Sequence, residues 1–296
     1  MLAFDYVKAH NVKQAVSYLS QRGESARILN GGTDLIVQLQ EGSQRASLLV
    51  DIKAIPELNQ LSYDPHQGLL VGAAVSCWDI CQFPAIKKYY PGLLDAVSLI
   101  GGVQIQGRAS LGGNLCNASP AADSIPALII YQATCLIAGP DGSREISVED
   151  FCIAPGQTAL RLGELLVSVR LPPPKIGGTG ACYLRFTPRS EMDIAVVGVG
   201  VAVVLSSDRT TFDWARIALG AVAPTPLLVP AAGEFLRGQK TSAAAIKQAA
   251  QIAKESTRPI NDMRGTIAQR KHLTAILVRR ALEKAIGRAQ QNDKEE

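Results

Sequence analysis

The sequence lacks the clustered cysteines that bind zinc or iron–sulfur centres. Its six cysteines stand apart along 296 residues, with no C-x-x-C pair and no plant-type C-x4-C-x2-C run. Cys77 and Cys81 are four residues apart, which on a helix puts them on one face, but two ligands do not make a metal site. The three histidines are far apart and form no H-E-x-x-H pattern. We therefore expect reduced, buried thiols and no metal ligands.

Long hydrophobic runs and strong charge of one sign are also missing. The longest apolar run, Ile194 to Leu205, has 12 residues, short of the ~20 that span a bilayer as a helix. The start of the chain shows no basic segment followed by an apolar core, so no secretory signal is visible. A net charge of +4, spread along the chain, is too weak and diffuse to indicate nucleic acid. We expect a soluble, cytoplasmic protein without a membrane span.

The apolar content, 47%, is enough to build cores over most of a chain of this length, which suggests about two domains. Val12, Ala15, Val16 and Leu19 have helical spacing and predict an amphipathic helix that ends near Gly23. A strand at 26–29, a helix at 35–40 and a strand at 48–52 follow. The first 55 residues therefore predict a small α/β unit.

The middle of the chain mixes regular and irregular patterns. We expect strands at 69–75, 135–138, 145–148 and 165–171, a helix at 85–99, and a hairpin turn at Asp141-Gly142. Between Gly101 and Pro126 the periodicity disappears and small polar residues with glycines replace it. Long ordered loops are more often functional than accidental.

A Pro/Gly stretch at 172–180 marks the best domain boundary. Beyond it we expect strands at 181–187, 194–205 and 214–222, then helices at 242–256 and 267–288. The second domain is therefore predicted as a short antiparallel sheet followed by helices, an α+β layout. A charged tail is expected at 290–296.

Two glycine-rich segments stand out as places for chemistry, Asn30-Gly31-Gly32-Thr33-Asp34 and Gly112-Gly113-Asn114. Glycine allows positive φ and lets backbone N–H groups approach an anion, and a helix start adds partial positive charge. The alternative is that Thr33 or Asp34 only caps the next helix. Neither a Rossmann fingerprint nor a phosphate loop is present, and Gly198-Val199-Gly200 is better explained by close backbone packing.

These segments resemble the two FAD-binding segments of a known family. Leu29 to Leu35, and Leu111 to Asn114 with Ala118 to Asp123, are similar to those of the flavin-carrying medium subunit of the molybdenum hydroxylases, the xanthine dehydrogenase and aerobic carbon monoxide dehydrogenase type. The resemblance continues through Tyr183-Leu184-Arg185 to Asp193, and then at 218–226 and at Asp262-Met263-Arg264-Gly265. The motifs cover nearly the whole chain in family order.

The resemblance implies a vanillyl-alcohol-oxidase-like FAD-binding domain of two α/β subdomains, followed by a C-terminal domain of a short antiparallel sheet plus helices. This α+β fold would divide into an FAD-binding domain at 1–176, with subdomains of about 1–56 and 57–176, and a C-terminal domain at 181–289.

The resemblance also assigns cofactor contacts residue by residue. Thr33 and its neighbours would offer N–H groups and a hydroxyl to the FAD pyrophosphate, as would Gly112 to Asn114. Asp123 matches the family carboxylate near the ribityl and adenosine side, Leu166 would pack on FAD, and Arg185 stands where many relatives have lysine. The full set of implied contacts is Leu29, Asn30, Gly31, Gly32, Thr33, Asp34, Leu35, Ala109, Ser110, Gly112, Gly113, Asn114, Cys116, Asn117, Asp123, Leu166 and Arg185.

The implied function is electron transfer, with no catalytic acid or base in this chain. An iron–sulfur small subunit would deliver electrons from [2Fe–2S] clusters, a molybdopterin-binding large subunit would carry the substrate chemistry, and NAD, oxygen or a quinone would serve as external acceptor. Two alternatives stay open: a free-standing flavoprotein oxidoreductase of the same fold, and a non-catalytic scaffold with a degenerate flavin site.

Overall fold

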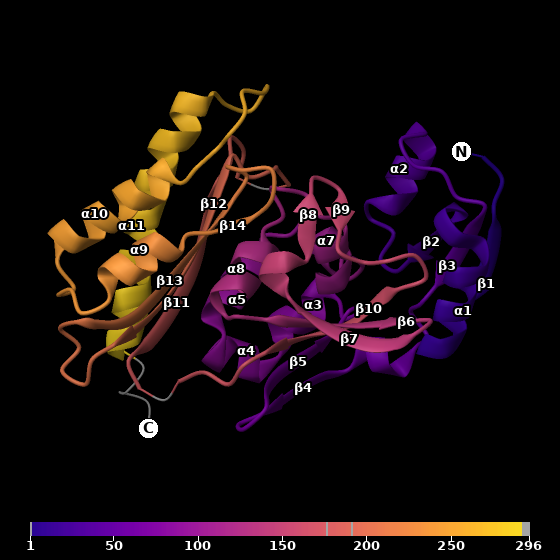
Figure 1. Cartoon of the computed structure of the whole chain (residues 1–296), viewed down its shortest axis with the longest axis horizontal. Helices are drawn as coiled ribbons and strands as arrows, with labels where there is room; N and C mark the ends of the chain where they lie inside the picture. Colours follow the sequence, from indigo (N-terminus) through magenta and orange to yellow (C-terminus); the bar gives the residue numbers. More distant parts are fainter. Residues whose placement is uncertain (1, 176, 191, 292–296) are drawn as a thin grey trace.

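The computed structural model describes residues 2–175, 177–190 and 192–291. Three sheets with flanking helices follow one another along the longest axis of the molecule, from the N-terminal unit to the C-terminal helices (Figure 1). Among the described residues, none of the helices combines the length and apolar character needed to cross a bilayer. The mixed helix and sheet content confirms the predicted α+β class.

The N-terminal unit is a three-stranded parallel sheet in the order β1-β3-β2. Its elements are β1 (Asp5–Lys8), α1 (Val12–Arg22), η1 (Gly23–Ser25), β2 (Ala26–Leu29), α2 (Leu35–Glu41) and β3 (Leu48–Asp51). The side chain of Asn11 caps α1 by accepting a hydrogen bond from the N–H of Gln14. The predicted helix after Val12 and the strands at 26–29 and 48–52 are confirmed.

The central unit is a five-stranded antiparallel sheet in the order β4-β5-β10-β6-β7. Its strands are β4 (Leu61–Asp64), β5 (Gly68–Gly72), β6 (Thr134–Gly139), β7 (Gly142–Ser147) and β10 (Leu165–Leu171). The hairpin at Asp141-Gly142 is confirmed, because β6 pairs with β7 across it. Strand β10 returns to the middle of the sheet, between β5 and β6, and only Arg170 in it is exposed.

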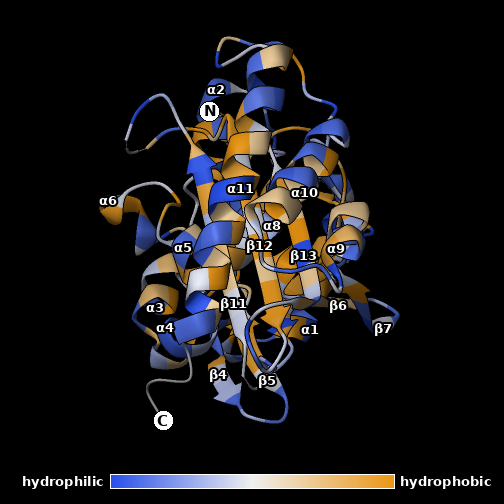
Figure 2. Ribbon diagram, turned by 90° about the vertical axis from the view of Figure 1, so that its left-hand side faces the viewer, coloured by the Kyte–Doolittle hydropathy of each residue, from blue (hydrophilic) through white to orange (hydrophobic). Residues whose placement is uncertain are grey.

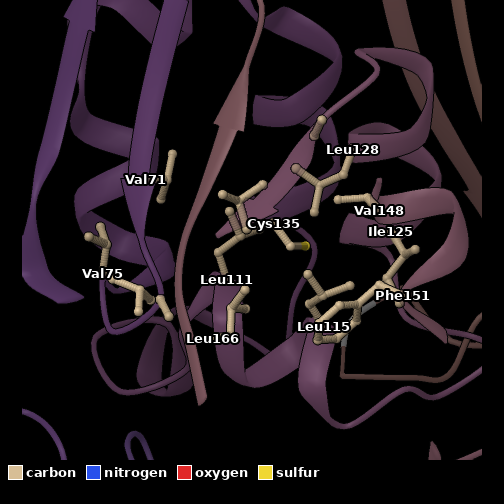
Figure 3. Close-up of a cluster of buried hydrophobic side chains, with 14 of the residues drawn as sticks. Val71, Val75, Leu111, Leu115, Ile125, Leu128, Cys135, Val148, Phe151 and Leu166 are labelled. Atoms are coloured by element: carbon tan, nitrogen blue, oxygen red, sulfur yellow. The ribbon is translucent and has the colours of Figure 1, made fainter. Parts of the chain in front are cut away.

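Short helices connect these strands and cover one face of the sheet. They are η2 (Pro56–Asn59), α3 (Cys77–Gln82), α4 (Pro84–Tyr89), α5 (Pro91–Val97), α6 (Val103–Gln106), α7 (Leu111–Cys116), α8 (Ser124–Ile130) and η3 (Val148–Asp150), with the small sheet β8 (Cys152–Ala154) and β9 (Gln157–Thr158). Leu111 and Leu115 of α7 meet Leu128 of α8 and Leu166 of β10 in a cluster of buried side chains (Figure 3). This packing holds α7 on the sheet.

The structure corrects two predictions in this region. The expected single helix at 85–99 is two helices, because Pro91 begins α5 after α4 has ended at Tyr89. The expected irregular segment from Gly101 to Pro126 contains α6, α7 and the start of α8. Gly112 and Gly113 therefore lie in the first turn of a helix and not in an open turn.

The C-terminal unit is a four-stranded antiparallel sheet in the order β11-β12-β13-β14 with helices on one face. Its elements are β11 (Thr179–Phe186), β12 (Val197–Leu205), β13 (Phe212–Gly220), β14 (Leu227–Leu228), α9 (Pro230–Leu236), α10 (Ala243–Glu255) and α11 (Ile267–Gln291). Figure 2 shows the hydrophobic strands β12 and β13 behind α10 and α11. Helix α11 reaches Gln291, so the predicted tail begins inside it, and 292–296 lie outside the described residues.

Polar contacts join the C-terminal unit to the central unit. Arg288 of α11 donates to both oxygens of Asp95 in α5, over 2.6 and 2.9 Å, and to the carbonyl of Ala181. Helix α5 packs on β11 in the same place. The predicted limit at 176 lies outside the described residues and the limit at 181 lies inside β11, and we keep both as a proposal.

Candidate functional site

A cavity of about 530 Å³ lies where the three units meet. Its wall comes from the segment after β2, from α7 and the residues around it, from β10 and β11, and from 192–194. Every residue that the resemblance singles out lines this cavity except Leu29, the last residue of β2. Segments as far apart in the sequence as Ile28 and Ile194 are therefore brought to one place.

The turn between β2 and α2 presents backbone N–H groups. Gly32 has φ +77°, a conformation that favours glycine. Within the described chain, the N–H groups of Gly32, Thr33 and Asp34 make no hydrogen bond. Asp34 stands at the N-cap of α2 but its side chain makes no capping bond, so the alternative that it only caps the helix is wrong. Open N–H groups at the start of a helix suit an anionic group.

The second glycine segment is built differently. The Ser110 hydroxyl caps α7 by accepting from the N–H of Gly113 at 3.0 Å, and the Asn114 N–H donates to the Ser110 carbonyl. The Gly112 N–H donates to the Ala73 carbonyl at 3.2 Å. These three N–H groups are thus already bonded within the protein, although the residues line the cavity. The pyrophosphate contact that was predicted for these N–H groups therefore has no unbonded donor in the structure.

The two glycine segments contact each other directly. The Asn30 side-chain amide donates to the Ser110 hydroxyl over 2.5 Å. A Cβ atom at Gly31 would lie 2.0 Å from the carbonyl oxygen of Arg108, so any larger residue would push the segments apart. Glycine at 31 is therefore needed for close approach, and the contact fixes one end of the cavity.

A buried ionic cluster forms another part of the wall. The Asp123 carboxylate accepts from the Tyr183 hydroxyl at 2.7 Å and from the Arg185 guanidinium at 2.6 Å. Burial raises the pKa of Asp123 to about 6, against the lowering effects of Arg185 and Tyr183. Burial also raises the pKa of Tyr183 well above its ordinary value. Because Asp123 precedes α8 and the other two lie on β11, the cluster links the central and C-terminal units.

The rest of the wall is largely apolar, and sequence reasoning missed most of it. The missed residues are Ile28, Gln38, Ile52, Ala73, Ile100, Gly101, Ile105, Ala121, Ala122, Leu160, Met192, Asp193 and Ile194. Ala121, Ala122 and Asp193 lie in segments that resemble the family but were not assigned to the site, whereas the isolated aliphatic residues of the wall carry no motif. Gln38 does donate to Asn117, a residue that the resemblance named, over 3.4 Å.

Other titratable groups of the cavity wall also have shifted pKa values. Desolvation by the wall raises the pKa of the Asp34 carboxyl, which has no hydrogen-bond or ion-pair partner among the described residues. Burial raises the pKa of the Cys116 thiol to about 12, so it stays protonated at neutral pH. All six cysteines are free. The site therefore offers no thiolate nucleophile.

The cavity is suited to a ligand with one anionic part and one flat apolar part. The volume lies within the range of small-molecule and cofactor sites. Open N–H groups at 32–34 can hold phosphate oxygens, while Leu166, Ile100 and Ile105 can cover an apolar ring. FAD has both parts, so the residues present fit that cofactor.

Comparisons with known proteins agree with this arrangement. Residues 2–174 match the family model described as "FAD binding domain in molybdopterin dehydrogenase", and residues 183–285 match "CO dehydrogenase flavoprotein C-terminal domain". A curated relative, the xanthine dehydrogenase FAD-binding subunit of Escherichia coli O157:H7, is 28% identical over 96% of both chains.

Solved structures show the same fold. Carbon monoxide dehydrogenase from Hydrogenophaga pseudoflava matches with a TM-score of 0.93 and 30% identity, covering 97% of this chain and 98% of that chain. Quinoline 2-oxidoreductase from Pseudomonas putida 86 matches with a TM-score of 0.90 and 28% identity over the same shares. The likeness thus spans both the cofactor unit and the C-terminal unit.

Proposed function

The chain belongs to the family of FAD-binding domains of molybdopterin dehydrogenases, and we propose that the cavity between its three units is where it holds FAD. The observation that carries this proposal is the turn at 30–34, whose open N–H groups face a cavity with apolar walls. The chain is an FAD-carrying electron-transfer subunit of a molybdenum hydroxylase.

FAD, when bound, supplies the ability to accept electrons one at a time, as iron–sulfur clusters deliver them, and to release them singly or in pairs to a different acceptor. The residues of this chain bind and orient it. The N–H groups of Gly32, Thr33 and Asp34 would hold the pyrophosphate, and the Asp34 carboxyl would accept a hydrogen bond from a cofactor hydroxyl. Leu166 and the isoleucines would exclude water from the ring.

The partners of this chain follow from its proposed role in electron transfer. An iron–sulfur subunit would deliver electrons to the bound FAD, and a molybdopterin-binding subunit would carry out the substrate chemistry. Support comes from the relatives, whose names describe one subunit or chain of larger dehydrogenases. The electrons would leave to an acceptor outside this chain, NAD among the candidates, and the complex would work in the cytoplasm.

Two valine variants test where FAD binds. Gly32 and Gly42 have nearly the same φ, +77° and +76°, so valine strains the backbone equally at both. A Cβ at Gly32 meets Ile36 and Leu29 at 3.2 Å beside the open N–H groups, whereas a Cβ at Gly42 meets nothing within 4 Å. Gly32→Val should lose most of its FAD while Gly42→Val keeps it, measured as FAD released per folded chain. Equal FAD content in the two variants would place the cofactor elsewhere.

A further inference from the structure

The carbonyl groups at 29–32, where the turn leaves β2, all accept hydrogen bonds within the protein. Backbone N–H groups bond the first and the last of them, at 3.2 and 3.1 Å. The Asn30 carbonyl accepts from the Lys53 ammonium over 3.4 Å. The Gly31 carbonyl accepts from the Arg108 guanidinium, also over 3.4 Å. Because carbonyl oxygens repel an anion, bonded carbonyls beside open N–H groups suit a turn that binds an anion.

Lys53 is anchored beside this turn, whereas Arg108 is not. The Lys53 ammonium pairs with the Asp51 carboxylate at 2.8 Å, and the Asp51 side chain is only 6% exposed. Asp51 also accepts from the Tyr6 hydroxyl at 2.5 Å and from the Lys53 backbone N–H at 2.9 Å. Arg108 is exposed, and its side chain makes no further hydrogen bond among the described residues. The Lys53 ammonium therefore has a fixed place next to the Asn30 carbonyl.

The parallel sheet explains why Lys53 lies there. Leu29 and Asp51 end the neighbouring strands β2 and β3 and are partners in the register of the sheet. The turn after β2 and the segment that carries Lys53 therefore leave the sheet at the same edge. Ligands of α/β sheets bind at the carboxyl ends of the strands, and a cation at that edge adds positive potential for an anion.

We propose that Lys53 is a positioning residue for the phosphates of FAD and acts through the Asn30 carbonyl. Lys53 itself does not line the cavity. Its bond to Asn30 keeps that oxygen engaged, so that the N–H groups of the turn stay open toward the cavity. This inference rests on the proposed FAD function. It restricts the effect of Lys53 to the phosphate end of the cofactor, so riboflavin, which has no phosphate, should not depend on Lys53.

Fluorescence titration of the cofactor-free protein, with FAD and with riboflavin, tests this role. Lys53→Met keeps the aliphatic stem but removes the ammonium, while Asp51 keeps its bonds from Tyr6 and the backbone, so the fold should survive. We expect Lys53→Met to bind FAD about tenfold more weakly and to bind riboflavin within about twofold of the parent protein. Lys53→Arg restores a cationic donor and should bind FAD within about threefold of the parent.

Lys8→Met is the matched control for the loss of one positive charge. Lys8 is exposed at the end of β1, opposite Asp51 in the register, and its side chain has no hydrogen-bond or ion-pair partner within the described ranges. It should bind FAD like the parent protein. The inference is overturned if Lys53→Met binds FAD as the parent does, if it loses FAD and riboflavin affinity equally, or if Lys8→Met weakens FAD binding as much.

Gly32→Val, measured in the same titration, separates this inference from the proposed function. If Gly32→Val loses FAD while Lys53→Met binds FAD normally, the cofactor cavity stands and only the role of Lys53 is wrong. If Gly32→Val keeps its FAD affinity, the proposed cofactor site is wrong, and the role of Lys53 falls with it.

Discussion

Arg185 matters first as the charge partner of a buried carboxylate. Its guanidinium and the Asp123 carboxylate are 2.6 Å apart, with side chains 7% and 10% exposed. Removing one member of a buried pair usually costs more than the pair contributes, because the remaining charge has lost both water and partner. The pair therefore makes the link between the units dependent on the protonation of Asp123.

Arg185→Met should lower the free energy of unfolding by about 3 kcal/mol near pH 8. Asp123 already has a pKa raised to about 6, and loss of Arg185 raises the pKa further. A carboxyl whose pKa is higher in the folded than in the unfolded state contributes stability that is fully present below the unfolded-state pKa. This contribution is lost as the pH rises through the folded-state pKa. The deficit of the variant should therefore shrink as the pH falls toward 5. Urea unfolding of the variant and of the parent protein, near pH 8 and near pH 5, measures this deficit in the free energy of unfolding.

Arg189→Met serves as the control, since the Arg189 side chain is 73% exposed and its ion pair with Asp193 is at the surface. Exposed pairs of this kind contribute little. We expect a small change in the unfolding free energy at both pH values. A deficit in Arg185→Met that grows toward low pH would show that Asp123 does not depend on Arg185 for its charge.

Helix α7 is the element on which the second glycine segment depends. Ser110 caps it and also accepts the hydrogen bond from Asn30, so one hydroxyl serves both the helix and the contact between the two segments. Ser242 caps α10 in the same way, by accepting from the Ala245 N–H, but it does not line the FAD cavity. The two serines therefore separate capping from cofactor binding.

Ser110→Ala should cost about 1–2 kcal/mol of stability and weaken FAD binding, because the cap and the Asn30 contact are lost together. Ser242→Ala should cost about 1 kcal/mol and leave FAD binding unchanged. Thermal unfolding and FAD titration of the cofactor-free protein measure both effects. If FAD binds the two variants equally well, the Asn30 contact has no part in forming the site.

The same helix shows where sequence reasoning stops. The strands at 26–29 and 48–52 and the long C-terminal helices were predicted from short apolar runs and from apolar periodicity. Strand β1 (Asp5–Lys8) was not predicted. Helix α7 has six residues, two of them glycines, which is too short and too unfavourable in propensity to give a periodic signal. The position of α7 depends on tertiary packing. A Cβ at Gly112 would lie 2.5 Å from the Ala73 carbonyl, so glycine lets α7 lie close to the sheet.

The cavity wall also has features that the sequence predicts and features that it does not. Asn30 to Asp34 and Ser110 to Asn114 were found because glycines beside amides and hydroxyls are unusual and match a family pattern. Which N–H groups are open could not be predicted, because Ala73 and Ser110 accept bonds that only the fold reveals. Close packing at Gly200, in contrast, was predicted, and a Cβ there would lie 2.8 Å from the Pro126 carbonyl.

In the whole molecule, three structural units surround one cavity. The C-terminal unit closes the wall through Arg185 and is fastened again by the Arg288 pair with Asp95. Further ion pairs cross between the central and C-terminal units, from Lys284 to Asp95 and from Arg216 to Glu149. This arrangement is the one that we propose for binding FAD, while the described residues contain no cluster of three or more metal-ligating side chains.

The chain expressed alone should therefore bind FAD without oxidising the substrates of its relatives. Hydroxylation needs a molybdenum centre, and delivery of electrons to FAD needs iron–sulfur clusters with cysteine ligands, whereas the six cysteines here stand apart and are mostly buried. We expect chemical reduction of the bound FAD to be reversible, and no dye reduction with a heterocyclic or aldehyde substrate. Co-expression with partner iron–sulfur and molybdopterin-binding subunits should give dye reduction, and a chain variant without FAD should block it. Substrate-dependent dye reduction by the chain alone would favour a free-standing oxidoreductase, and a chain that never takes up FAD would favour the scaffold.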